Sequence, residues 1–197
     1  SEPVECEQVT IGECDLRVMG RCVDGQRVCP TLPIGPEFCR CDEAAAPGRP
    51  TYLTCNETMA HDAAEGFCGD VELATEPMIR AQSTMLNTTT GFEMKVFLNF
   101  QAQSRRAFDV WLAPKYLGPP VIENFRTWLS GVFDDAVASA VQIGDNWRPT
   151  SPHCLVLESS GTAVINPIPC TQTQTAAVSC EFCPRPGQDD DGDGIWT

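Results

Sequence analysis

The residues best spaced to bind a metal ion lie in the last stretch of the sequence. Asp189, Asp191 and Asp193 occupy alternate positions, and Gly194 follows them. Carboxylates at loop positions 1, 3 and 5, with a glycine at position 6 for the sharp turn, are typical of a calcium loop. The sequence ends at Thr197, before the acid that would stand at position 12. We therefore expect weak calcium binding here, and a solvated acidic end is the alternative.

The two histidines give no support for catalysis. His61 and His153 lie outside any recognised nucleophile or zinc-protease motif. His153 precedes Cys154, and the two could form a thiol–imidazole pair only if Cys154 were a free thiol. The sequence therefore predicts a protein that is not an enzyme.

Composition limits the partners and the compartment. The chain has 27 Asp and Glu against 13 Lys and Arg, a net charge of −14, which disfavours binding to nucleic acid. It has no apolar run of about 20 residues, the length that a membrane span requires. Twelve cysteines indicate maturation in an oxidising compartment. Because no signal sequence is visible, the prediction of a secreted or cell-surface location rests on cysteine usage.

The cysteines are densest at the start of the chain, where prolines and glycines separate them and no helical period is present. We expect residues 1–46 to form a small disulfide-stapled module, because so short a segment cannot bury a core. A zinc site is the alternative for these thiols. Residues 47–183 would then form the main domain and residues 184–197 the acidic tail. The cysteines of the first segment are Cys6, Cys14, Cys22, Cys29, Cys39 and Cys41.

Periodicity and capping residues place the elements that must position any site. We predict helices at about residues 59–67, 77–85 and 93–102. Short strands are expected at residues 155–157 and 163–165, joined by a turn. Residues 132–153 have little period and form a long loop.

Several short motifs follow one another over about residues 50–182. They are Ala64 with Cys68, Val110-Trp111-Leu112, Trp128-Leu129-Ser130-Gly131, Asn146-Trp147, Cys154-Leu155-Val156-Leu157, Cys170 and Cys180-Glu181. Their order resembles the C-type lectin-like domain, although His61 stands where the family has a tryptophan. The resemblance implies an α+β fold with two helices, antiparallel sheets and a long loop that carries recognition.

The resemblance also implies particular disulfides. It pairs Cys154 with Cys170 and Cys68 with Cys180, which would remove the thiol–imidazole alternative. Cys55 is expected to pair with Cys39 or Cys41, as in the family's long form. Because the number of remaining cysteines is even, we expect all of them to be oxidised and Cys183 to reach back into the N-terminal module.

The family's calcium-dependent sugar site is not complete in this sequence. Its W-N-D motif falls on Ile165, Asn166 and Pro167, and the loop before Cys154 has neither E-P-N nor Q-P-D. Proline has no side-chain oxygen, so an anionic ligand is missing. The loop could still bind a ligand through other side chains. The candidates are Asp134, Asp135, Asp145, Asn146, Trp147 and Asn166.

The sequence thus predicts an extracellular recognition or adhesion module that binds protein or glycan without the usual calcium site. The alternative is a structural subunit of an extracellular filament or sheath, with self-assembly. The tail resembles the opening of a thrombospondin type-3 repeat, and calcium is expected there alone.

Overall fold

The computed structural model describes residues 4–12, 14–32, 34–42, 51–74, 80–85, 87, 90–103, 108–118, 124–144, 146–159, 162–173 and 176–183. The chain divides into two compact units. Unit 1 contains Ser1–Glu57, Ala63–Met85 and Val178–Thr197, and unit 2 contains Thr58–Asp62 and Leu86–Ala177. No helix of the described residues is long and apolar enough to cross a membrane.

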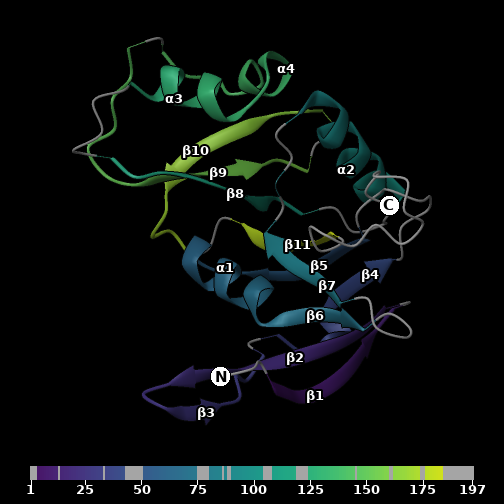
Figure 1. The fold of residues 1–197 in the computed structure, drawn as a ribbon. Helices are drawn as coiled ribbons and strands as arrows, with labels where there is room; N and C mark the ends of the chain where they lie inside the picture. The colour runs from purple at the N-terminus through teal and green to yellow at the C-terminus, as the bar shows by residue number, and fades with distance from the viewer. Residues whose placement is uncertain are drawn as a thin grey trace, which may run out of the picture. The chain divides into compact units, whose positions relative to one another are not determined.

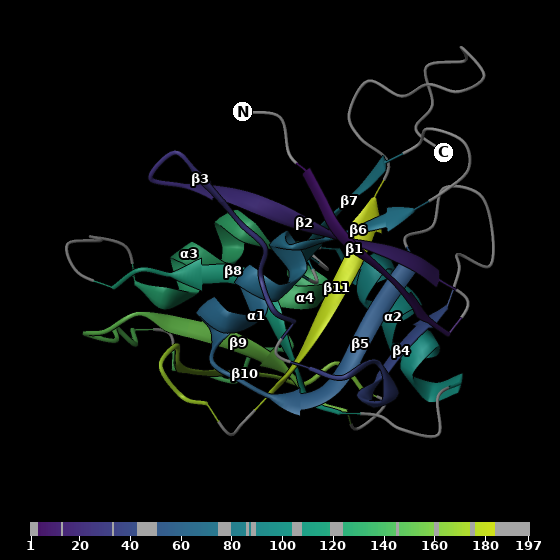
Figure 2. The same ribbon diagram turned by 90° about the horizontal axis from the view of Figure 1, so that it is seen from below.

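Unit 1 is built on strands that hydrogen-bond in the order β1, β2, β6, β7 and β11 (Figure 1). β3 pairs with β2, and β5 pairs with both β11 and β4. β5 and β11 run side by side in Figure 2. The bounds are β1 Val4–Ile11, β2 Cys14–Val23, β3 Gln26–Val28, η1 Pro36–Phe38, β4 Cys39–Asp42, β5 Thr51–Thr58, β6 Val71–Ala74, β7 Arg80–Met85 and β11 Ala177–Cys183.

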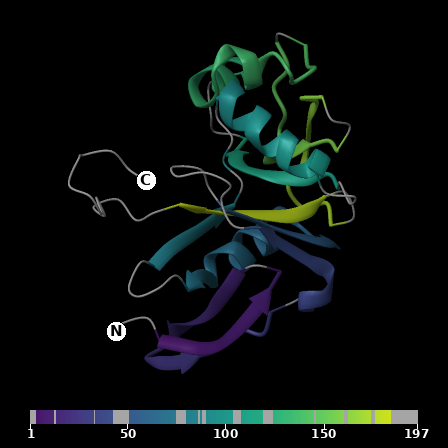
Figure 3. The same cartoon turned by 90° about the vertical axis from the view of Figure 1, so that its right-hand side faces the viewer.

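The N-terminal segment does not form a unit of its own, contrary to the boundary expected at residue 46. β2 pairs antiparallel with β6, so that Leu16 lies opposite Leu73 and Val18 opposite Val71. Leu16 and Val18 are fully buried. Figure 3 shows β1 and β2 as the purple pair at the end of this sheet. A segment too small to bury a core therefore completes the core of a larger sheet.

Three disulfides join the N-terminal strands of unit 1. They are Cys6–Cys29, Cys14–Cys41 and Cys39–Cys55. Because these six sulfurs are bonded to one another, they cannot serve as zinc ligands, and the zinc alternative is wrong. Cys39 and Cys41 were the two partners expected for Cys55, and in the structure Cys55 forms its disulfide with Cys39. The side chain of Cys183 lies outside the described residues, and its expected link to the N-terminal segment would require Cys22, the one cysteine of that segment that forms no described disulfide.

Cys22 is a free, exposed thiol on β2, so the expectation that every remaining cysteine is oxidised does not hold there. We expect the native protein, without reductant, to react with a maleimide at Cys22 because nothing covers it. Peptide mapping of the labelled protein measures this. Cys22→Ser should remove the native-state label, and a Cys22 peptide found in an intrachain disulfide would contradict the prediction.

Helix α1 (His61–Gly69) begins within two residues of the start expected from the sequence. Its residues in unit 1 bury Ala64, Phe67 and Cys68, which share one face at helical spacing. Cys68 is joined to Cys180 of β11, the pair that the resemblance implied. The helix is thereby attached to the last strand of the described chain.

Among its described residues, unit 2 has helix α2 (Gly91–Gln103), two short helices and a sheet of three strands. The strands β8 (Val110–Tyr116), β9 (His153–Leu157) and β10 (Ile165–Pro169) form an antiparallel sheet, with β9 in the middle. The short helices are α3 (Phe125–Val132) and α4 (Asp135–Ala138). Trp111, Leu155, Leu157 and Ile165 are fully buried and form part of the core. Cys154 of β9 is bonded to Cys170, again the pair implied by the resemblance.

β10 is the last strand in the order of the sheet and contains two prolines, Pro167 and Pro169. Pro167 lies opposite Leu155 and Pro169 opposite His153. The amide of Cys170, just after the strand, donates to the carbonyl of Pro152 at 3.2 Å. Prolines are tolerated in a strand only where no ladder hydrogen bond needs their missing N–H.

One element predicted from the sequence was wrong, and one helix was not predicted. Residues 80–85 of the helix expected at 77–85 form β7, whereas residues 77–79 lie outside the described residues. β7 pairs antiparallel with β6 on one side and β11 on the other, and this pairing outweighs the local helical preference. Residues 125–132 form α3, which the sequence reading had not placed. The helix expected at 93–102 lies within α2.

Candidate functional site

Helix α3 forms the base of the long loop. Asn124 is its N-cap, and the Asn124 side chain accepts a hydrogen bond from the Thr127 amide at 2.8 Å. This satisfies one of the amides that a helix leaves without an internal partner. Phe125 and Leu129, four residues apart, are buried on one face. Trp128 packs against Tyr116 of β8 with ring centroids 5.6 Å apart, whereas Thr127 and Ser130 are exposed.

A cluster of aromatic rings fixes the middle of the loop onto this helix. Trp147 packs against Phe125 with ring centroids 5.0 Å apart and against His153 at 5.1 Å. The amide of Phe125 also donates to the carbonyl of Trp147 at 3.1 Å. Tilted and edge-to-face rings at these distances are favourable beyond the area they bury. The position of Trp147 is therefore set by both its ring and its backbone.

Asp134 is a helix cap rather than a ligand. As the N-cap of α4, it accepts from the Val137 amide at 2.9 Å, and its second oxygen accepts from the Gly91 amide of α2 at 2.8 Å. These hydrogen bonds, Gly91 first, hold the pKa of the carboxyl below its usual value. One exposed carboxylate thus satisfies amides at the start of two helices of unit 2.

We expect Asp134→Ala to lower the melting temperature at neutral pH and to have less effect in acid. The pKa of Asp134 is lowered in the folded protein, so its contribution is complete above the ordinary value of 3.8 and is lost as the pH falls through the folded value. Melting curves of both proteins, followed by circular dichroism from neutral pH to below 3.8, should therefore converge. Asp135→Ala is the matched control, and an equal effect of that change would contradict the capping role.

The remaining loop candidates do not assemble into an ion site. Asp135 and Asn146 are exposed, and Asp145 lies outside the described residues. Asn166 donates through Nδ2 to a carboxylate oxygen of Glu158. Within the described part of the long loop, no three His, Cys, Asp or Glu side chains lie close enough to share one ion. Of the described acidic candidates of the loop, Asp134 is thus engaged at the starts of two helices and Asp135 is exposed.

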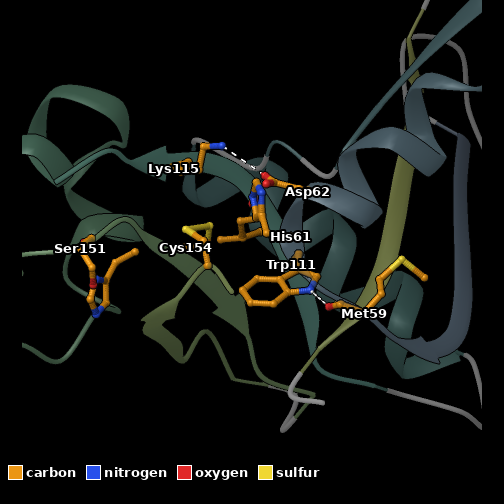
Figure 4. Close-up of a disulfide and its surroundings, with 10 residues drawn as sticks. Met59, His61, Asp62, Trp111, Lys115, Ser151 and Cys154 are labelled. Carbon is orange, nitrogen blue, oxygen red and sulfur yellow. Dashed lines mark hydrogen bonds and ion pairs between the residues drawn. A yellow bond between two sulfur atoms is a disulfide. The ribbon is translucent and has the colours of Figure 1, made fainter. Parts of the chain in front are cut away.

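The two histidines have structural positions. His61 is fully buried in unit 2, and its Nε2 donates to the carbonyl of Leu112 at 2.9 Å. Its ring meets Trp111 edge-on at 5.5 Å, and the indole Nε1 of Trp111 donates to the carbonyl of Met59 at 2.7 Å (Figure 4). Because Cys154 is in a disulfide, His153 has no thiol to activate.

Arg126 was not among the residues predicted from the sequence, yet it holds the loop to α3. Its guanidinium donates to three backbone carbonyls, those of Ala138, Val141 and Ile143. The signal for α3 was present, since Phe125, Trp128, Leu129 and Val132 recur at helical spacing after an asparagine that can cap. Nothing in the sequence pointed to the carbonyls.

The acidic tail lies outside the described residues, so Asp189, Asp191 and Asp193 have no described geometry. Their role remains an expectation based on spacing.

The pairs Cys68–Cys180 and Cys154–Cys170 join an α+β chain whose described strands are mainly antiparallel. The α+β fold and these two disulfides are those that the resemblance to the C-type lectin-like domain implied. No family model matches the sequence, and no curated protein does. Among solved structures, the chain is similar to EMS16, an antagonist of the collagen receptor integrin α2β1. The TM-score is 0.43 and the sequence identity is 11%, and the match covers 70% of this chain and 94% of EMS16. So distant a likeness carries no information on what the present chain binds.

Proposed function

We propose that this chain is an extracellular recognition module that binds a protein or glycan through its long loop, without the calcium-dependent sugar site of its fold. The observation that carries the proposal is a largely exposed loop whose described residues are attached to α3 by ring packing and hydrogen bonds. Trp147 is fixed against Phe125, while its neighbours Asn146 and Arg148 are exposed. Binding residues are commonly found on loops that a rigid scaffold positions.

The residue after Asn166 supports calcium independence. Asn166 is the one residue retained from the W-N-D motif, and Pro167 of β10 follows it. A calcium ion needs six to eight oxygen ligands, and proline has no side-chain oxygen to replace that of the aspartate. The five disulfides are typical of proteins that mature in an oxidising compartment, which supports a secreted or cell-surface location.

The test is binding of the purified chain to a glycan array and to immobilised extracellular proteins, with and without EDTA. We expect binding that survives EDTA and that falls at least about tenfold in Asn146→Ala/Arg148→Ala, the scale of losing one or two polar contacts. The control, Lys95→Ala/Asn99→Ala, removes the same kinds of group from the exposed side of α2. Binding that EDTA abolishes, or that the loop variant leaves intact, would reject the proposal.

The alternative, a subunit of an extracellular filament or sheath, gives a different result in the same preparation. Size-exclusion chromatography and electron microscopy would then show ordered assemblies, and the array would show no specific binding.

We further propose that any calcium the chain binds depends on Asp189, Asp191 and Asp193. The expected dissociation constant is roughly 10⁻⁴ to 10⁻³ M, the range of weak extracellular sites, because the loop has few ligands. Calorimetry should detect heat with the full chain and none with a version ending at Gln188. Calcium heat that survives this truncation would assign the ion to another site.

A further inference from the structure

Arg126 makes an unusual set of contacts for a surface arginine. Its Nη1 donates to the carbonyl of Ala138 at 3.1 Å, and its Nη2 donates to those of Val141 at 3.3 Å and Ile143 at 3.0 Å. The three acceptors come from the end of α4 and from the loop that follows it. None of the ion pairs of the described residues involves Arg126. Its charge is therefore directed at backbone oxygens.

The carbonyl of Ala138 also accepts from the Val141 amide at 3.2 Å, and Arg126 is the described donor to the carbonyls of Val141 and Ile143. The last carbonyls of a helix have no intrahelical donor, and α4 is only four residues long. A guanidinium presents five N–H groups in a rigid fork, and hydrogen bonds from a charged donor are about twice as strong as neutral ones. A calcium ion can order a loop by binding several carbonyl oxygens around one positive charge. In this chain the positive charge is the guanidinium of Arg126, which is part of the protein.

The bonds of Arg126 complement the other restraints on the loop. The amide of Ile165 donates to the carbonyl of Ala140 at 3.3 Å, and the amide of Trp147 donates to that of Gly144 at 3.2 Å. The residues between these points, 141–143, contribute two of the three carbonyls that Arg126 binds. Without the guanidinium, this part of the loop would lose its main described attachment to α3.

We propose that Arg126 is the positioning residue of the long loop: its guanidinium supplies the cation around which the loop folds, in place of a calcium ion. The importance of this for recognition rests on the proposed function. The ordering of the loop itself does not, and it can be measured with no ligand present.

The experiment measures amide hydrogen exchange on the full chain, once in EDTA and once in calcium. The rates are read at the amides of Ala140, Val141 and Trp147. These amides donate to the carbonyls of Val137, Ala138 and Gly144. In the wild type, we expect the same exchange rates in EDTA and in calcium. In Arg126→Ala, these amides should exchange about tenfold faster or more, the factor expected for losing a charge-assisted hydrogen bond. The amides of β9 should keep their rates.

Two further variants separate positioning from general destabilisation. Arg126→Lys should restore part of the protection, because an ammonium group can bind fewer of the three carbonyls at once. Dilute guanidinium chloride should restore protection in Arg126→Ala, whereas sodium chloride at equal ionic strength should not. Arg148→Ala is the matched control, since it removes an exposed arginine from the same loop.

Three results would overturn the inference: wild-type exchange in Arg126→Ala, loop protection in the wild type that EDTA removes, or equal acceleration of the β9 and loop amides. If Arg126→Ala loosens the loop but no variant binds any glycan or protein, Arg126 keeps its role and the recognition function fails.

Discussion

Replacing both Cys68 and Cys180 by alanine is expected to lower the free energy of unfolding by about 4.7 kcal/mol, the chain-entropy value for a loop of roughly 100 residues. The bond closes a loop with a sequence separation of 112, and both cysteines are fully buried. Without it, the unfolded chain gains conformational freedom, and α1 loses its covalent attachment to β11. Urea denaturation followed by tryptophan fluorescence measures the change.

The matched control is the double change Cys154→Ala/Cys170→Ala, which opens a loop with a separation of only 16. The same model gives about 3 kcal/mol for a loop of that size. If removing the shorter bond cost as much as removing the longer one, chain entropy would not be the main source of the stabilisation.

Trp111→Ala is expected to destabilise unit 2 by about 3–5 kcal/mol, the cost of truncating a large aromatic side chain in a core. Trp111 is 0% exposed, its ring contacts His61, and its indole satisfies the carbonyl of Met59. The change leaves a cavity and a buried carbonyl without its donor, and these two costs add. The free energy of unfolding, again from urea titration, gives the size of the effect.

Phe92→Ala provides the comparison, because Phe92 is 69% exposed at the start of α2. Truncation there should change stability by less than about 0.5 kcal/mol, as is usual for surface positions. A small effect of Trp111→Ala, or a large effect of Phe92→Ala, would show that the core of unit 2 lies elsewhere.

The features predicted correctly depend on spacing along the chain. Helix α1 begins two residues after its predicted start, and β9 contains the predicted strand 155–157, whereas β10 begins only at the last residue of the strand predicted at 163–165. The pairs Cys68–Cys180 and Cys154–Cys170 were implied by the resemblance to the C-type lectin-like domain, which rests on the order of short motifs along the chain.

The errors come from pairing between distant segments. β7 is a strand because β6 and β11 supply hydrogen-bond partners on both sides, which the sequence of residues 80–85 does not reveal. The N-terminal segment was taken for a separate module because its own composition cannot support a core. Its Leu16 is buried in the sheet that β2 forms with β6.

The candidate site shows the same limit. Asp134 was chosen as a ligand because it is acidic and lies in the long loop, yet its oxygens cap α4 and the start of α2. Arg126 was not chosen because its partners are backbone carbonyls, which every residue has. Side-chain type therefore indicates where binding could occur, whereas the three-dimensional structure decides which groups remain available.

The prolines of β10 bear on how copies of this protein could join. Since the Cys170 amide points toward β9, alternation along the strand directs the amide positions of Ile165, Pro167 and Pro169 to the outer edge. Ile165 already donates to Ala140, and the prolines have no N–H to offer. An incoming strand would find acceptors here but no donors. Growth of a continuous intermolecular β-sheet from this edge is therefore blocked, and any filament would have to form through side-chain contacts or another strand.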